Sequence, residues 1–139
     1  MRIVLDTNVL VSGLLSPFVP PGQIVALVSS GDPQLCFDAR IMLEYREVLL
    51  RPAFGFDPAH VHTLVDHVED EGFEVIAQPL AAGLPDPADE AFLAVAIASS
   101  ASALVTGNLR HFPADLQAGV SVLSPADFLR LYHELTAGA

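Results

Sequence analysis

Short apolar runs alternate with longer helical patterns along this chain, and that alternation constrains the fold more than any other feature. The short runs, which predict strands, are residues 2–5, 35–37, 73–77, 103–105 and 120–123. The longer patterns, which predict helices, are residues 9–15, 23–30, 41–50, 58–71, 87–100 and 125–135. Strands that alternate with helices favour a parallel sheet whose two faces are both covered by helices. The sequence therefore predicts an α/β fold.

The length of 139 residues suits one domain, which we place over residues 1–139, and an apolar content of 52% is enough to bury a sizeable core. The single cysteine, Cys36, cannot pair within the chain, and no cluster of cysteines and histidines has zinc-site spacing. No apolar run reaches about 18 residues, and Asp6 comes too early for a signal-peptide core. We therefore expect a soluble, cytoplasmic protein with no membrane partner.

The net charge of −11 argues against a protein that holds nucleic acid through a basic surface. All six basic residues are arginines, and none of them lies between Pro52 and Leu109, where nine acidic residues fall. Five of these acids predict a solvated helix face, namely Asp66, Glu69, Asp70, Glu71 and Glu74. The acids at Asp86, Asp89 and Glu90 permit a more specific interpretation.

Two predicted strands end in small hydrogen-bonding triplets, Asp6-Thr7-Asn8 and Thr106-Gly107-Asn108. In an open parallel sheet, ligands bind at the carboxyl ends of the strands, so these triplets are candidate site residues. Each triplet taken alone is also what a turn or a helix cap uses.

Glu44 is a third candidate, because on a helical wheel it lies beside Ile41 and Val48 at the edge of an apolar stripe. A carboxylate in that position is costly unless another group pairs with it. The alternative is an ion pair at the surface with Arg40 or Arg51.

The fourth candidate is the acidic segment 86–90, which precedes a strongly apolar helix. As local structure it is a good helix start, with Asp86 as N-cap, Pro87 in the first turn, and Asp89 and Glu90 favoured by the helix dipole. The alternation of strands and helices also predicts that segment 86–90 lies near the two strand-end triplets. The apolar surplus of the helix itself indicates a surface that a second copy covers.

Taken together, Asp6, Glu44 and Asp89 are predicted to converge at one end of the sheet, with Asn108 or Asp86 assisting. Carboxylates held close together repel one another, and because the chain has no lysine the natural neutraliser is a divalent cation. Oxygen ligands select Mg²⁺ or Mn²⁺. Phosphodiester hydrolysis is the reaction that such a site serves best.

Four segments resemble, in order and spacing, the motifs of PIN-domain ribonucleases of the toxin type (VapC-like) found in toxin–antitoxin pairs. They are IVLDTNVLVSGL, ARIMLEYREVLLRP, DPADEAFLAVAIA and ALVTGNLRHFP. The resemblance implies a PIN-like three-layer sandwich with a central parallel sheet of about five strands. It also implies Mg²⁺- or Mn²⁺-dependent cleavage of single-stranded RNA, and a homodimer.

The resemblance makes Asp6, Glu44 and Asp89 the catalytic, metal-binding acids. The residues implied to shape or assist the site are Thr7, Asn8, Asp86, Thr106 and Asn108. Many family members carry Asp where this chain has Asn108, and an amide binds a second metal less firmly. We therefore expect one well-held metal ion, with a second joining only alongside RNA. Some members carry Asp where this chain has His111, which we interpret as a surface or packed histidine rather than a catalytic one.

Two other functions are compatible with parts of this pattern. A phosphotransferase of the haloacid-dehalogenase type would use Asp6 as nucleophile. That class requires a second Asp at the position of Asn8 and a lysine to hold the transferred phosphate, and this chain has no lysine. A catalytically silent PIN-like module would bind RNA or a protein partner without cleavage, and Asn108 favours it.

The expected partners follow from exposed apolar positions and from the acidic cluster. Leu43 and Leu50, on the side of their helix away from Ile41, are the candidates for a homodimer contact. An antitoxin that inhibits the enzyme is expected to be basic and to place an Arg or Lys among the clustered carboxylates.

Overall fold

The computed structural model describes residues 1–137, and its centre is a parallel sheet. The five strands in this part of the chain are β1 (Arg2–Leu5), β2 (Gln34–Phe37), β3 (Phe73–Glu74), β4 (Ala103–Val105) and β5 (Val122–Leu123). Their order across the sheet is β3-β2-β1-β4-β5, and every neighbouring pair is parallel. The first strand of the chain is therefore the central one, and its residues Ile3, Val4 and Leu5 are fully buried.

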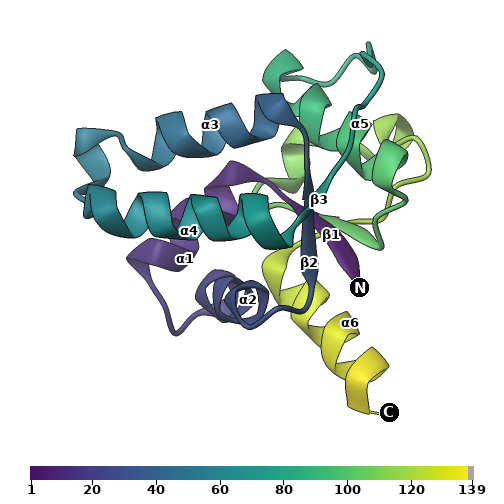
Figure 1. Cartoon of the computed structure of the whole chain (residues 1–139). Coiled ribbons are helices and arrows are strands. Elements are labelled where there is room, and N and C mark those ends of the chain that lie inside the picture. Colours follow the sequence, from purple (N-terminus) through teal and green to yellow (C-terminus); the bar gives the residue numbers. More distant parts are fainter. Residues whose placement is uncertain (138–139) are drawn as a thin grey trace.

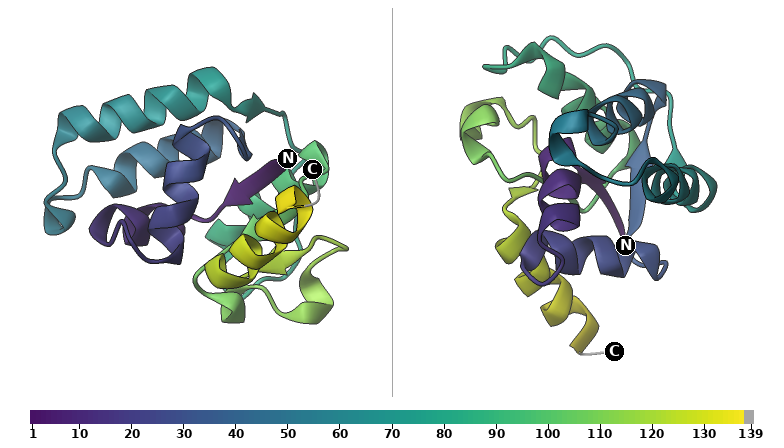
Figure 2. Two further views of the ribbon diagram at one scale, coloured as in Figure 1. Left: turned by 90° about the horizontal axis from the view of Figure 1, so that it is seen from below. Right: turned by 90° about the vertical axis from the view of Figure 1, so that its left-hand side faces the viewer.

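Helices cover both faces of this sheet, which makes the fold the predicted three-layer α/β sandwich (Figure 1). The α-helices in the described residues are α1 (Thr7–Leu15), α2 (Pro20–Ser29), α3 (Ala39–Leu49), α4 (Pro58–Glu71), α5 (Glu90–Ser99) and α6 (Pro125–Ala137). Helix α5 packs on β1, β2 and β4 from one side, while α1, α2 and α4 gather on the other (Figure 1). Helix α6 contacts α2, β4 and β5, and its end projects from the body of the protein (Figure 2).

Helices α1 and α2 cross closely at an angle of 101°. Glycine permits this approach, because a Cβ atom on Gly13 of α1 would lie 2.9 Å from the carbonyl oxygen of Pro21 in α2. Within the described residues no single helix is long and apolar enough to cross a membrane, although this bent pair passes that test when its two helices are taken together.

The ends of several elements differ from the sequence prediction for local reasons. The third strand stops at Glu74 instead of residue 77, because it is an edge strand and its ladder to β2 ends with the bond from Val75 N to Phe37 O (2.9 Å). The second helix begins at Pro20 rather than at residue 23, since proline is well suited to the first helical turn. The predicted helix 87–100 begins as a 3₁₀ turn, Pro87–Asp89, before α5.

The apolar surplus of α5 is mostly covered within the chain itself. Phe92, Leu93 and Val95 are buried between the sheet, α3 and the segment that includes Leu84. Only Ile97 of its large apolar residues is exposed, at 44%. This helix therefore gives little support to a dimer contact. In contrast, α3 exposes Leu43 at 66% and Leu50 at 38%, as the sequence predicted.

Candidate active site

The carboxyl ends of β1 and β4 place the two polar triplets side by side. Leu5 is paired with Val105 in the ladder, and Asp6 N donates to Val105 O at 2.9 Å. Asp6 Oδ2 then accepts hydrogen bonds from Thr106 Oγ1 at 2.8 Å and from Asn8 Nδ2 at 3.3 Å. Asp6 is 6% exposed and Thr106 is fully buried, so this carboxylate is held rigidly at the centre of the sheet edge.

The second triplet completes this arrangement through backbone donors. Gly107 N donates to Asn8 Oδ1 at 3.0 Å, and Asn108 N donates to Thr106 Oγ1 at 3.0 Å. Asn8 and Thr106 thus both donate to Asp6, and each accepts a backbone hydrogen bond from the second triplet.

Glu44 reaches the same edge from α3. The hydroxyl group of Thr7, the first residue of α1, donates a hydrogen bond to Glu44 Oε2. The alternative ion pair with Arg40 is not formed, because Arg40 binds Asp38 instead, with its Nη2 atom 2.7 Å from Asp38 Oδ2. Asp38 also caps α3 by accepting from Ile41 N at 3.0 Å.

Tyr45, the residue after Glu44, ties α3 to the end of β1. Its hydroxyl donates to the carbonyl oxygen of Leu5 at 2.5 Å, and its side chain is completely buried. This bond joins the element that carries Glu44 to the residue that precedes Asp6. The sequence alone does not predict this contact, because it joins two residues that are 40 positions apart.

Asp86 and Asp89 have different local roles although both begin the same helical segment. Asp86 is the predicted N-cap, since its Oδ1 accepts from Ala88 N at 3.0 Å. Asp89 makes no capping hydrogen bond and is 7% exposed. Its Oδ2 atom is buried and has no hydrogen-bond donor in residues 1–137. Helix capping therefore does not account for the burial of Asp89.

His111 faces this unpaired oxygen. It lies on the 3₁₀ turn Leu109–His111 that follows β4, and its Nδ1 atom is 3.0 Å from Asp89 Oδ2. The other ring nitrogen, Nε2, is 3.0 Å from Asn108 Nδ2. His111 is therefore a partly exposed histidine that packs against the acidic cluster, and its spacing of three from Asn108 after a strand end was the available signal.

Burial and mutual repulsion dominate the electrostatics of this cluster. Burial is the largest cause that raises the pKa of Asp6 and that of Glu44. Burial also raises the pKa of Asp89 to about 6; the negative charges of Asp6 and Asp86 add to this rise, and the neighbouring His111 opposes it. Asp6 and Asp86 likewise raise the pKa of Glu44.

The donor set fits a divalent cation. No arginine in residues 1–137 forms an ion pair with Asp6, Glu44, Asp86 or Asp89. The oxygen of Asp89 that lacks a donor is the kind of atom that a metal ion would satisfy. One ligand atom from each of Asp86, Asp89 and His111 lies within 4.8 Å of the others.

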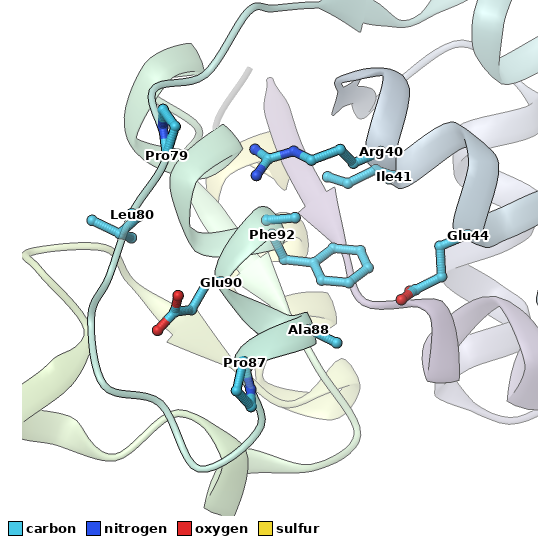
Figure 3. A pocket seen from close by; sticks show the side chains of 10 residues that line it. Arg40, Ile41, Glu44, Pro79, Leu80, Pro87, Ala88, Glu90 and Phe92 are labelled. Carbon is cyan, nitrogen blue, oxygen red and sulfur yellow. The ribbon is translucent and has the colours of Figure 1, made fainter.

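A cleft of about 300 Å³ adjoins the carboxylates between α3 and the start of α5 (Figure 3). Glu44 and Arg40 line one wall, and Pro87 and Glu90 lie across from them (Figure 3). The wall that includes Pro79 is held in place because Gly83 N donates to Glu90 Oε1 at 3.0 Å. Glu90 is thus used structurally, and Glu44 is the carboxylate of the cluster that lines the cleft.

Comparison with known proteins agrees with this fold. A family model described as PIN domain matches residues 2–110, and the chain therefore belongs to the PIN domain family. A chain in the crystal structure of VapBC2 from Rickettsia felis bound to a DNA fragment from their promoter has a similar fold, with a TM-score of 0.55 and 13% sequence identity. The match covers 89% of this chain and 98% of that chain. No curated protein sequence matches.

Proposed function

We propose that this protein is a metal-dependent endoribonuclease that hydrolyses phosphodiester bonds of single-stranded RNA and acts as the toxin of a toxin–antitoxin pair. The observation that carries the proposal is the convergence of Asp6, Glu44 and Asp89 without an arginine partner. The PIN domain match and the fold shared with a VapBC2 chain support the same function.

Asp6, Glu44 and Asp89 would hold Mg²⁺ or Mn²⁺, with Asp86 assisting. Such an ion, when bound, activates a water molecule and stabilises the leaving oxygen of a phosphodiester. Thr106 and Asn8 orient the carboxylate of Asp6, and Thr7 orients that of Glu44. Because these supporting groups are fixed by the backbone of β1 and β4, the ligands need little rearrangement on binding.

The cleft beside Glu44 is the proposed path of the RNA strand. Its walls offer apolar contacts at Pro79, Leu80 and Pro87, and Arg40 is its cation. The net charge of −11 gives RNA no general attraction to this protein, so binding is proposed to rely on the metal ion and Arg40.

The test is incubation of the purified protein with single-stranded RNA in Mg²⁺, in Mn²⁺ and in EDTA. We expect cleavage only with the metals, a loss of at least a hundredfold in Asp6→Asn, and full activity in Glu47→Gln, whose side chain is exposed on α3. RNA binding without turnover under all conditions would favour the silent binding module, which the amide at Asn108 also suits. Equal cleavage in EDTA would contradict the metal requirement.

We also propose two protein contacts. The first is a homodimer formed through Leu43 and Leu50 of α3. The second is a basic antitoxin whose Arg or Lys enters the carboxylate cluster, takes the neutralising place of the metal and blocks the attacking water. An inhibitor that instead binds the acidic face of α4 and leaves metal binding intact would contradict the second contact.

A further inference from the structure

The proposed function leaves His111 and Asn108 without a role, although both lie at the carboxylate cluster. His111 Nδ1 is 3.0 Å from Asp89 Oδ2. No hydrogen bond of good geometry joins the two groups, and this buried oxygen has no donor among the described residues.

The separation of the two atoms suits two ligands of one ion. Ligand atoms at about 2.1 Å from a metal and at right angles to each other lie about 3.0 Å apart. Asp86 also offers a carboxylate oxygen within 4.8 Å of the ligand atoms of Asp89 and His111. An ion among these three residues would satisfy Asp89 Oδ2, which nothing else in residues 1–137 does.

Asn108 is placed to hold the imidazole in the orientation that a ligand needs. A histidine that binds metal through Nδ1 carries its proton on Nε2, and that proton usually goes to a neighbouring acceptor. Asn108 Nδ2 is 3.0 Å from Nε2, and a half-turn of the amide, whose nitrogen and oxygen are nearly isosteric, brings the acceptor Oδ1 to the same place. The backbone of Asn108 is itself fixed by Thr106 Oγ1 at 3.0 Å.

We propose that His111 Nδ1 is a metal ligand together with Asp86 and Asp89, that Asn108 positions its ring, and that this nitrogen makes the site prefer Mn²⁺ over Mg²⁺. The inference rests on the metal site of the proposed function. Its physical reason is that Mg²⁺ takes oxygen ligands, whereas imidazole binds first-row transition ions well. The neutral amide at position 108 is then a positioning residue for the histidine.

The test measures metal binding directly rather than cleavage. Mn²⁺ and Mg²⁺ affinities are determined by calorimetry for the wild type, His111→Ala and His62→Ala, the last being an exposed histidine of α4. We expect His111→Ala to weaken Mn²⁺ binding at least tenfold, to change Mg²⁺ binding less than about threefold, and to remove the ¹⁴N modulation from the electron spin echo of bound Mn²⁺. We expect His62→Ala to change none of these.

Two further variants separate ligation from packing. His111→Asp should retain Mg²⁺ binding and lose the nitrogen signal, and Asn108→Ala should weaken Mn²⁺ binding while the nitrogen signal remains. Unchanged Mn²⁺ affinity in a folded His111→Ala, with no nitrogen signal in the wild type, overturns this inference. The proposed function survives that result if Asp6→Asn still abolishes metal binding. A wild type that binds neither Mn²⁺ nor Mg²⁺ would contradict both the inference about His111 and the proposed function.

Discussion

At the scale of single residues, the main feature is a set of carboxylates buried close together. Asp86 supplies the helix cap, so Asp89 is left without a capping role and faces the other acids. Its negative charge is opposed by burial and by the charges of Asp6 and Asp86. In the absence of metal this side chain therefore works against the folded state.

The first prediction is that Asp89→Asn leaves the metal-free protein as stable as the wild type or more stable, and abolishes most RNA cleavage. The reason is that the amide removes a repelled charge together with a metal ligand. Thermal denaturation in EDTA and an RNA cleavage assay check the two parts. A loss of about 0.5–1 kcal/mol of stability with activity retained would instead mark Asp89 as a helix-start residue.

The second prediction concerns the pH dependence of the metal-free protein. The pKa of Asp89 is raised from 3.8 to about 6 in the folded state, so the folded protein binds this proton more tightly than the unfolded chain. Its contribution to stability is complete below pH 3.8 and is lost as the pH rises through about 6. The pKa values of Asp6 and Glu44 are shifted in the same direction.

We therefore expect a higher denaturation midpoint at pH 5 than at pH 7.5 when EDTA is present, and a smaller difference in Asp89→Asn. Urea denaturation at the two pH values measures it. A wild type that is less stable at pH 5 than at pH 7.5 would mean that these carboxylates are not repelled in the folded protein.

At the scale of elements, α3 presents two different sides. One side of it carries Glu44 and is tied to β1 through Tyr45, and another side exposes Leu43 and Leu50. The helix can serve both the site and a partner because these positions lie at different angles around its axis.

The third prediction is that Tyr45→Phe costs about 1 kcal/mol of stability, the usual value of one intramolecular hydrogen bond. It should also lower cleavage, since α3 is no longer fixed to the residue before Asp6. Denaturation and cleavage assays measure the two effects. We expect the variant to bind single-stranded RNA as tightly as the wild type does. If cleavage is unaffected, the bond to the Leu5 carbonyl has no part in positioning Glu44.

The fourth prediction is that the protein sediments as a dimer at micromolar concentration and that Leu43→Ser shifts it toward the monomer. An exposed leucine at the contact contributes through burial of apolar surface, which serine lacks. Leu135→Ser on α6, where the leucine is 57% exposed, is the matched control and should leave the dimer intact. A monomeric mass for the wild type would refute the proposed dimer.

At the scale of the whole molecule, the net charge of −11 predicts that bound cations stabilise the fold. The fifth prediction is that the melting temperature rises as Mn²⁺ or Mg²⁺ is added, because an ion that binds only the folded state stabilises it by mass action, by about 2.7 kcal/mol at a hundred times its dissociation constant. Asp6→Asn should flatten this rise and Glu47→Gln should not. An equal rise in all three proteins would place the bound ions elsewhere on the surface.

The sequence predicted the sheet and most of the site because both depend on local patterns. Each apolar run became a strand, and parallel strands necessarily bring the residues after them, such as Asp6 and Thr106, to one edge. The role of His111 was not predictable in this way, since its contact with Asp89 depends on the path of a 3₁₀ turn. The burial of α5 was likewise missed, because hydrophobicity alone does not say whether the same chain or another covers a helix.

The position of β1 at the centre of the sheet has a consequence for how the protein is made. Translation produces β1 first, but its neighbour β4 comes only after Ser102, and Thr106 lies 100 residues beyond the carboxylate that it holds. A growing polypeptide that ends before β4 leaves one edge of β1 unpaired and Asp6 without its hydroxyl donor. We therefore expect a fragment that ends before Thr106 to lack the proposed nuclease activity, because its site is incomplete.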